Sequence, residues 1–267
     1  MSLLHLFILA VIQGLTEFLP VSSSGHLIIL PQLTGMQDQG QAIDVAVHVG
    51  TLGAVILYFW KDVKKTIGGC GDILRGRFNT EDAKLAFMLI AATIPVIIVG
   101  LMLKLTGYDD ALRSIKVIAW AMLIFGIVLY FADQKGAQNK TTSDWNFPDA
   151  IKLGLWQAIA LIPGTSRSGI TITGARQMGY SREDGARIAM LMSIPTIIAS
   201  GVLLGAEVIS TADAQVARDS AIGAVFAFIS ALLAISLMMK LLKSVSFTPY
   251  VIYRVILGLI LLWIAYT

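Results

Sequence analysis

The chain has 267 residues, of which 56% are hydrophobic and only 14% are charged. A mean hydropathy of +0.77 excludes a water-soluble globular domain and predicts an all-α polytopic membrane protein surrounded by membrane lipids. The net charge of +3 is small, so we expect no nucleic acid partner and take the positive residues as markers of topology.

The N-terminal segment is apolar but does not form a complete span. Its hydrophobic run, Leu3 to Val11, is too short to cross a bilayer, and the next residues lack the features of a signal peptide. The chain continues into QGLTEFLPVSSSGH at residues 13–26, where Pro20 and Gly25 interrupt helical geometry. Such backbone is tolerated at membrane depth only where it is buried in protein or lines a wet cavity. We therefore predict a re-entrant helical hairpin with a polar tip.

Six later apolar runs are each close to the roughly 20 residues that a helix needs to cross about 30 Å of hydrocarbon. They lie at residues 42–60, 85–104, 116–132, 186–206, 220–239 and 249–266. We therefore predict six transmembrane helices. The one cysteine, Cys70, lies in the basic loop after the first run, which excludes an intrachain disulfide.

A second polar segment repeats the pattern of the first. The segment QAIALIPGTSRSGI, at residues 157–170, aligns with residues 13–26 at an offset of 144. The alignment pairs Gln13 with Gln157, Ser22 with Ser166, Ser24 with Ser168 and Gly25 with Gly169. Each copy precedes three of the six spans, which indicates an internal duplication. We expect a first repeat at 1–132, a cytoplasmic linker at 133–150 and a second repeat at 151–267.

Each repeat would consist of one re-entrant hairpin and three spans. Three is an odd number, so the second repeat must be inverted relative to the first. With the loop 61–84 placed inside, the inner segments hold 14 Lys and Arg residues and the outer segments hold four. The positive-inside rule therefore places both termini outside. The two hairpins would enter from opposite faces and meet near the midplane.

The tip of the second hairpin carries an arginine at membrane depth. An unpaired Arg167 would cost several kcal/mol there, so it needs an anionic partner or ligand. Its guanidinium suits phosphate oxygens, and the hydroxyls of Ser166, Ser168 and Thr171 flank it. Together these residues predict a phosphate cradle. The alternative is a structural ion pair between Arg167 and Glu17, and both interpretations hold if the pair exists before a ligand binds.

The first hairpin carries groups that can act on a bound phosphate. Glu17 can serve as a base or metal ligand, and His26 as an acid, base or nucleophile. The hydroxyls of Ser22, Ser23 and Ser24 are candidate nucleophiles and donors. Phosphoryl transfer needs charge neutralisation and an activated attacking group, and the two hairpins supply both. The alternatives are that the serines only satisfy freed backbone carbonyls and that His26 is a packing hydrogen-bond partner.

Two further features lie outside the hairpins. Asp44 and His48 are four residues apart on one helix face, which favours a structural hydrogen bond between them over a role in the pocket. Arg254, in the last span, is expected to snorkel to the interface beside Tyr253.

The two polar segments resemble the signatures of a known family. QGLTEFLPVSSSGH resembles the first signature of the bacterial undecaprenyl-pyrophosphate phosphatases, the bacitracin-resistance family, and PGTSRSGIT at residues 163–171 resembles the second. The length, the duplication and the ending SFTPYVIYR also fit. The resemblance implies a hydrolase of the bacterial inner membrane that converts undecaprenyl pyrophosphate to undecaprenyl phosphate and phosphate. It would recycle the lipid carrier for peptidoglycan and cell-wall synthesis, maintain cell shape and confer resistance to the antibiotic bacitracin.

The resemblance also implies roles for single residues. Glu17 would be the acidic residue of the first motif, Ser23 and His26 its catalytic candidates, and Arg167 would act with them. The phosphate-binding set would comprise Ser22, Ser24, Ser166, Arg167, Ser168 and Thr171. The family implies Mg²⁺ or another divalent cation, held here by Glu17. Gln13 stands where many relatives have glutamate and could coordinate through its carbonyl oxygen.

Three routes to the attacking group stay open at this point. We favour Ser23 as nucleophile assisted by His26 and Glu17, over a His26 nucleophile or a metal-activated water. The alternative function is a polyprenyl-phosphate transporter or flippase, because broken helices in inverted repeats are typical of transporters. A homodimer is compatible with either function. The enzyme is expected to open its active site to the periplasmic side.

Overall fold

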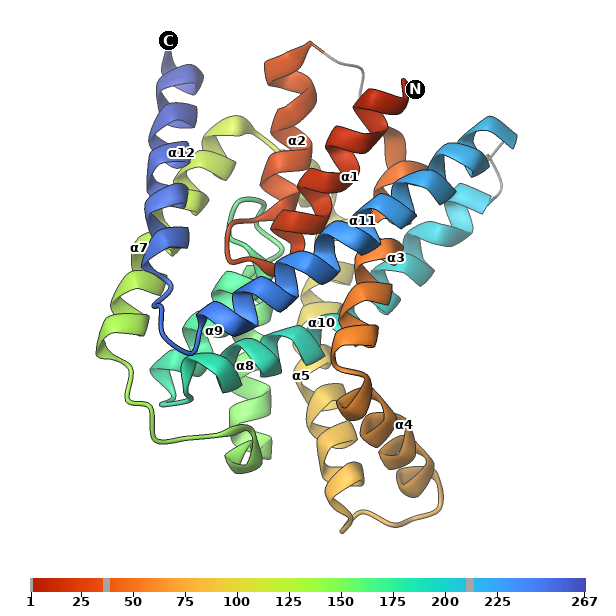
Figure 1. Cartoon of the computed structure of the whole chain (residues 1–267), viewed down its shortest axis with the longest axis vertical. Coiled ribbons are helices and arrows are strands. Elements are labelled where there is room, and N and C mark those ends of the chain that lie inside the picture. Colours follow the sequence, from red (N-terminus) through yellow and green to blue (C-terminus); the bar gives the residue numbers. More distant parts are fainter. Residues whose placement is uncertain (1, 36–38, 210–213) are drawn as a thin grey trace.

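The computed structural model describes residues 2–35, 39–209 and 214–267, and within these residues every regular element is a helix (Figure 1). The α-helices are α1 (Leu3–Phe18), α2 (Ser23–Thr34), α3 (Gly40–Tyr58), α4 (Trp60–Leu74), α5 (Glu81–Thr106), α6 (Tyr108–Ala111), α7 (Ile115–Lys135), α8 (Phe147–Ile159), α9 (Arg167–Gln177), α10 (Arg182–Ile209), α11 (Ala214–Leu241) and α12 (Thr248–Tyr266). A 3-10 helix, Thr142–Asp144, lies between α7 and α8. The predicted all-α class is confirmed.

Six helices among the described residues are long and apolar enough to cross a membrane. They are α3, α5, α7, α11 and α12 in full, together with Arg182–Val202 of α10. Each covers most or all of one predicted run, so the prediction of six spans is confirmed. Large apolar side chains point outward from these helices, including Ile98 of α5, Leu233 of α11 and Ile260 of α12. Such a surface fits the lipid contact of a multi-pass membrane protein.

Two pairs of shorter helices, α1–α2 before α3 and α8–α9 before α10, are each joined by a turn. The pair α1 and α2 lies in the upper half of Figure 1, with α1 packed along α11. The pair α8 and α9 lies below it, where α8 packs on α5 and α9 packs on α7 and α10. The two turns meet, since the Ser168 hydroxyl donates to the backbone carbonyl of Leu19 (3.0 Å). The two segments predicted as hairpins therefore form helix–turn–helix pairs in contact.

Small residues let the helices approach closely. A Cβ atom on Gly50 of α3 would lie 2.1 Å from the carbonyl oxygen of Ala224 in α11, and one on Gly14 of α1 would lie 2.0 Å from Oγ of Ser230. Helix association in a bilayer depends on such packing because lipid tails are as apolar as the side chains. α11 is therefore held tightly against both α1 and α3.

A buried ionic network ties the ends of α7 and α9 together. Arg176 is fully buried, and its guanidinium donates to Oδ1 of Asp133 (3.1 Å) and to the backbone carbonyl of Gly136 (3.0 Å). Nearby, the hydroxyl of Tyr180 donates to Oδ2 of Asp149 (2.7 Å), and burial together with this carboxylate raises the pKa of Tyr180. Because breaking a buried pair leaves an uncompensated charge, the network fixes the end of α9 against α7.

The expectation that Arg254 snorkels to the interface is wrong. Arg254 is fully buried, and its guanidinium donates to four backbone carbonyls inside the protein. The acceptors are Met122 (from Nε, 3.2 Å), Ala121 (from Nη2, 3.3 Å), Pro20 (from Nη1, 3.4 Å) and Gly164 (from Nη2, 3.0 Å). Pro20 and Gly164 lie in the two turns, where the backbone leaves helical geometry and its carbonyls need other donors. These carbonyls hold the guanidinium in the interior.

We expect Gly50→Ala to lower the free energy of unfolding by about 1–3 kcal/mol, because the new methyl group would meet the backbone of α11. Gly71→Ala in α4 is the control, since the described residues outside its own stretch of helix leave open space at its Cβ position and alanine favours a helix over glycine. Thermal unfolding of the purified protein in detergent measures both variants. A Tm for Gly50→Ala equal to that of the wild type would contradict the close approach of α3 and α11.

Candidate functional site

The two turns end in the same local conformation. α2 and α9 are each capped by a serine with positive φ, 74° at Ser22 and 71° at Ser166. No other non-glycine residue in the described part of the chain has positive φ, and such a conformation costs about 1–3 kcal/mol. Each serine Oγ accepts a hydrogen bond from the N–H of Gly25 (3.4 Å) or Gly169 (3.1 Å). These caps hold the strained backbone at the start of each helix.

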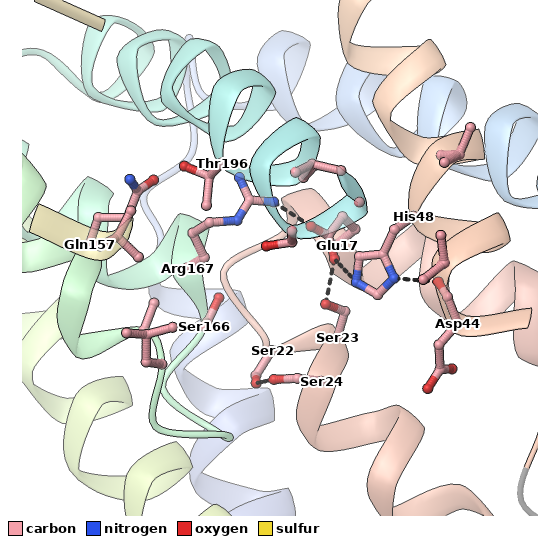
Figure 2. Close-up of a pocket in the computed structure, with 18 of the residues that line it drawn as sticks. Glu17, Ser22, Ser23, Ser24, Asp44, His48, Gln157, Ser166, Arg167 and Thr196 are labelled. Atoms are coloured by element: carbon pink, nitrogen blue, oxygen red, sulfur yellow. Dashed lines mark hydrogen bonds and ion pairs between the residues drawn. The ribbon is translucent and has the colours of Figure 1, made fainter. Parts of the chain in front are cut away.

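The residue after each capping serine points to the same carboxylate. Ser23 and Arg167 begin α2 and α9 and are equivalent in the repeat. The hydroxyl of Ser23 donates to Oε2 of Glu17 (2.6 Å), and Nη2 of Arg167 donates to Oε1 of the same residue. Figure 2 shows both contacts. The two halves of the chain therefore converge on one carboxylate near the end of α1.

Two further side chains complete the surroundings of Glu17. Gln13, one turn earlier in α1, donates from Nε2 to Oε2 of Glu17 (3.0 Å). Nε2 of His48 lies 3.7 Å from the same oxygen (Figure 2). The other ring nitrogen of His48, Nδ1, donates to the backbone carbonyl of Asp44 (2.7 Å). The predicted contact between Asp44 and His48 therefore exists, through the backbone. A buried carboxylate is stable only with such partners.

Glu17 lies in the wall of a cavity of about 590 Å³ (Figure 2). Six predicted site residues line it: Glu17, Ser22, Ser23, Ser24, Ser166 and Arg167. Apolar side chains form another part of the wall, including Val45, Val49, Val96, Leu161 and Ile197. A cation and several hydroxyls beside an apolar wall suit a ligand with an anionic head and an apolar body.

Three predicted site residues lie outside the cavity wall. Gln13 bonds Glu17, and Ser168 bonds the first turn through the carbonyl of Leu19 (3.0 Å). Thr171 is fully buried in α9, and its Oγ1 has no hydrogen-bond partner among the described residues. None of the three is among the described residues that line the cavity.

His26 faces away from the cavity, toward α12. Its Nδ1 donates to the backbone carbonyl of Ser22 (2.6 Å), so its Nε2 accepts from the hydroxyl of Tyr253 (2.5 Å). The two rings are stacked with centroids 5.7 Å apart. Both nitrogens of His26 are therefore engaged in holding the strained turn at Ser22 against α12.

Sequence reasoning did not place several other polar residues in the cavity wall, and four of them bear on the site. Asp44 and His48 line it, although a purely structural contact was expected, and so do Gln157 and Arg113. The alignment of the two segments could have pointed to Gln157, because it pairs this fully buried residue with Gln13. Arg113 lies between α6 and α7. Its positive charge in a short outer segment was the one sequence feature that could have predicted a place in the site.

The donor atoms fit a metal ion only in part. No group of three or more His, Cys, Asp or Glu side chains that could hold a metal occurs in the described ranges. Glu17 offers one carboxylate, and Oε1 of Gln13 is buried without a hydrogen-bond partner there. Magnesium is commonly held by one or two carboxylates together with phosphate oxygens and water. Among the described side chains that meet at Glu17, this carboxylate and the amide oxygen of Gln13 are therefore the candidate oxygen ligands for such an ion.

The arrangement can bind an anion and activate a hydroxyl. Arg167 and the start of α9 offer positive charge and N–H donors. Glu17 is within hydrogen-bond distance of the Ser23 hydroxyl and can accept its proton. These are the elements of nucleophilic attack on an anionic centre.

Comparison with known proteins identifies a matching family and similar sequences. Residues 6–260 match the family described as bacitracin resistance protein BacA. A protein named undecaprenyl-diphosphatase from Jannaschia sp. (strain CCS1) is 70% identical over 266 residues, covering 100% of both chains. Another of that name from Ruegeria pomeroyi is 69% identical over 267 residues, again covering 100% of both chains. A third from Saccharophagus degradans is 44% identical over 258 residues, which are 97% of this chain and 96% of that protein.

Replacing Tyr253 by phenylalanine should lower the free energy of unfolding by about 1 kcal/mol, since Nε2 of His26 loses its hydrogen-bond donor while the stacked rings remain. Tyr266→Phe is the control, because the contact of its ring with Lys116 (4.7 Å) does not involve the hydroxyl. Thermal unfolding of both variants in the same detergent measures the difference. Equal stability of the two would mean that the bond to His26 does not stabilise the turn.

Proposed function

Because the chain belongs to the family of the bacitracin resistance protein BacA, we propose that it is an undecaprenyl-diphosphatase. It would hydrolyse undecaprenyl diphosphate to undecaprenyl phosphate and inorganic phosphate, recycling the lipid carrier for cell-wall synthesis and conferring bacitracin resistance. The observation that carries this proposal is the convergence of Ser23 and Arg167 on Glu17. It provides a nucleophile, its base and an anion-binding guanidinium in one cavity.

In the mechanism that we propose, Ser23 attacks the terminal phosphorus. Glu17, 2.6 Å from the hydroxyl, takes the proton as Oγ bonds to phosphorus. The bond from phosphorus to the bridging oxygen breaks, and undecaprenyl phosphate leaves with the electron pair. Glu17 then releases this proton to solvent. Water attacks the phosphorus of the phosphoserine and gives a proton to Glu17, the bond from phosphorus to Oγ breaks, and Oγ takes the proton back from Glu17 as inorganic phosphate is released.

Arg167 would bind the terminal phosphate and neutralise the charge that develops on its oxygens. The hydroxyls of Ser22, Ser24 and Ser166 line the same cavity and would donate to these oxygens, while Ser168 joins α9 to the first turn through the carbonyl of Leu19. Without substrate, Arg167 bonds Glu17. An arriving phosphate competes for the guanidinium, which leaves Glu17 available as the base.

The position of His26 favours Ser23 as the nucleophile. Both nitrogens of His26 have hydrogen-bond partners, the Ser22 carbonyl and the Tyr253 hydroxyl. An attacking nitrogen would need a free lone pair directed at phosphorus, whereas the Ser23 hydroxyl lies in the cavity wall beside its base. We therefore assign His26 the task of holding the turn that presents Ser23.

Magnesium is the cofactor that we propose, with Glu17 as its carboxylate ligand. The Oε1 atom of Gln13, unpartnered among the described residues, is the second candidate oxygen. The ion would supply positive charge beside the transferred phosphate. Glu17 and Gln13 are one turn apart in α1, so both residues lie on the helix face that bears the site.

For the membrane, we propose an inverted repeat of two re-entrant hairpins and six spans in the bacterial inner membrane. The matching conformations of Ser22 and Ser166 and the excess of Lys and Arg in the expected inner loops support this arrangement. The cavity is lined from the beginning of α3 and the later part of α10. In this orientation it opens to the periplasmic side. The repeats would span 1–132 and 151–267, with the linker 133–150 inside.

A polyprenyl-phosphate transporter is the competing function, because broken helices at a repeat interface are also found in transporters. The short contact between Ser23 and Glu17 (2.6 Å) favours the hydrolase. A carrier needs positive charge for its cargo, but it has no use for a hydroxyl paired with a base.

The first test is release of inorganic phosphate from undecaprenyl diphosphate by the purified protein in detergent. We expect Ser23→Ala to lower kcat by at least about 10³-fold, since no other hydroxyl of the described residues bonds Glu17. Ser24→Ala should lower kcat by less than about 100-fold, because Ser24 bonds Ser22 instead and removes at most one donor to the phosphate.

Chelation and two further variants belong to the same assay. EDTA should abolish release and added magnesium should restore it, and Arg167→Ala and Glu17→Gln should each be inactive while still folded. A wild-type protein that binds the lipid but releases no phosphate with magnesium present would overturn the hydrolase and favour a carrier.

The native Cys70 tests the orientation without any mutation. It is exposed and lies in α4, which we place on the cytoplasmic side. A membrane-impermeant maleimide should label it only after the inner membrane is permeabilised. In a Cys70→Ser background, a cysteine at the exposed Tyr108 of α6 should be labelled without permeabilisation. The reverse pattern would place the active site on the cytoplasmic side.

A further inference from the structure

We propose that Arg254 is a positioning residue that holds the two turns in register, so that Ser23 and Arg167 both reach Glu17. This inference rests on the proposed hydrolase function for its kinetic consequences. Its structural part concerns the turns alone and is tested separately.

The contacts of Arg254 join equivalent atoms of the two halves. Nη1 donates to the carbonyl of Pro20 (3.4 Å) and Nη2 donates to the carbonyl of Gly164 (3.0 Å). At the repeat offset of 144, Pro20 and Gly164 are the same position. One guanidinium therefore binds the matching carbonyl of each turn.

Each of these two carbonyls lies a few residues before one of the reactive side chains in the chain. Pro20 precedes Ser23 by three residues, and Gly164 precedes Arg167 by three residues. A shift of either carbonyl moves the start of α2 or α9, and with it the group that bonds Glu17. A misplacement of about 1 Å can reduce a rate about 100-fold.

The described residues around Arg254 leave room for the side chain and give it no charged partner. A Cβ atom on Gly169 would lie 2.9 Å from Nη1 of Arg254, and one on Gly126 would lie 3.2 Å from its Cβ. Arg254 is fully buried, and no carboxylate of the described residues forms an ion pair with it. A buried charge without a counter-ion is costly. The guanidinium has five N–H donors in a fixed plane, and here they bond carbonyls of α7 and of both turns. A lysine ammonium group cannot reproduce this set of directions.

The chain contains a matched control for substitution of Arg254. Arg176 is also fully buried and also donates to several backbone carbonyls, those of Asp133, Gly136, Ala137 and Tyr180. It is not among the residues that line the cavity. Arg176→Lys and Arg254→Lys therefore both replace a buried guanidinium by a positively charged ammonium group. Only Arg254→Lys removes hydrogen bonds to the carbonyls of Pro20 and Gly164 in the two turns.

The experiment compares the two lysine variants in the full-length protein. For folded Arg254→Lys, kcat for phosphate release should fall about 10- to 100-fold while KM changes less than about threefold. For Arg176→Lys, kcat per folded molecule should stay near that of the wild type. A merely structural Arg254 predicts equal kcat per folded molecule for the two variants, and that result would overturn the inference.

Hydrogen exchange read by mass spectrometry tests the clamp without enzyme activity. Amides of residues 19–25 and 163–169 should exchange faster in Arg254→Lys than in Arg176→Lys, because both turns lose their shared donor. Unchanged exchange at either turn would overturn the inference. If the wild type releases no phosphate, the proposed function fails, and the exchange result alone decides whether Arg254 holds the turns.

A second pair of variants displaces Arg254 without removing it, in case Arg254→Lys does not fold. Gly126→Ala in α7 would press on Cβ and Nε of Arg254, from 3.2 and 3.5 Å. Gly258→Ala lies in the same pair of helices and would meet backbone atoms and Leu123 at 3.2–3.4 Å. We expect a lower kcat for Gly126→Ala than for Gly258→Ala. Equal kcat values in the two folded variants would count against the positioning role.

Discussion

A buried carboxylate, Glu17, joins the two halves of the chain. Its oxygens receive the hydroxyl of Ser23 from the first turn and the guanidinium of Arg167 from the second. Because a buried charge without partners is unstable, the halves cannot separate without a large cost. The same contacts bring a hydroxyl, a base and a cation together. Glu17 therefore contributes both to the stability of the interface and to the reactivity of the site.

The turns that surround Glu17 meet a second constraint, the demand of freed backbone groups for hydrogen bonds. Where helices end inside an apolar environment, each carbonyl needs a donor from the protein. Ser168 supplies one to Leu19, and Arg254 supplies others to Pro20 and Gly164. Each of these donors crosses from one segment of the chain to another. Satisfying the backbone thus also fixes how the two turns lie relative to each other.

The features that the sequence predicted are local ones. Hydropathy found six spans because each depends only on its own residues, and the repeated serine and glycine spacing found both turns. The orientations of His26 toward Tyr253 and of Arg254 toward the turns could not be predicted in this way. They depend on the rotation of α2 and α12 and on which carbonyls of distant segments lack partners. The place of Arg113 in the cavity wall could not be predicted either, because the short segment before α7 carries no periodic pattern.

The positive φ at Ser22 and Ser166 also bears on how the protein can change during evolution. Glycine adopts this conformation without strain, so a mutation to glycine at either position would ease the backbone while deleting a hydroxyl from the cavity wall. The same mutation would also remove the helix cap that the hydroxyl provides, so its gain in backbone freedom is offset in part by the loss of the cap. The two aligned segments both carry serine at this point, as they also share the glutamine, the second serine and the glycine of the pattern. At both positions the serine hydroxyl is therefore kept in the cavity wall together with the strained backbone.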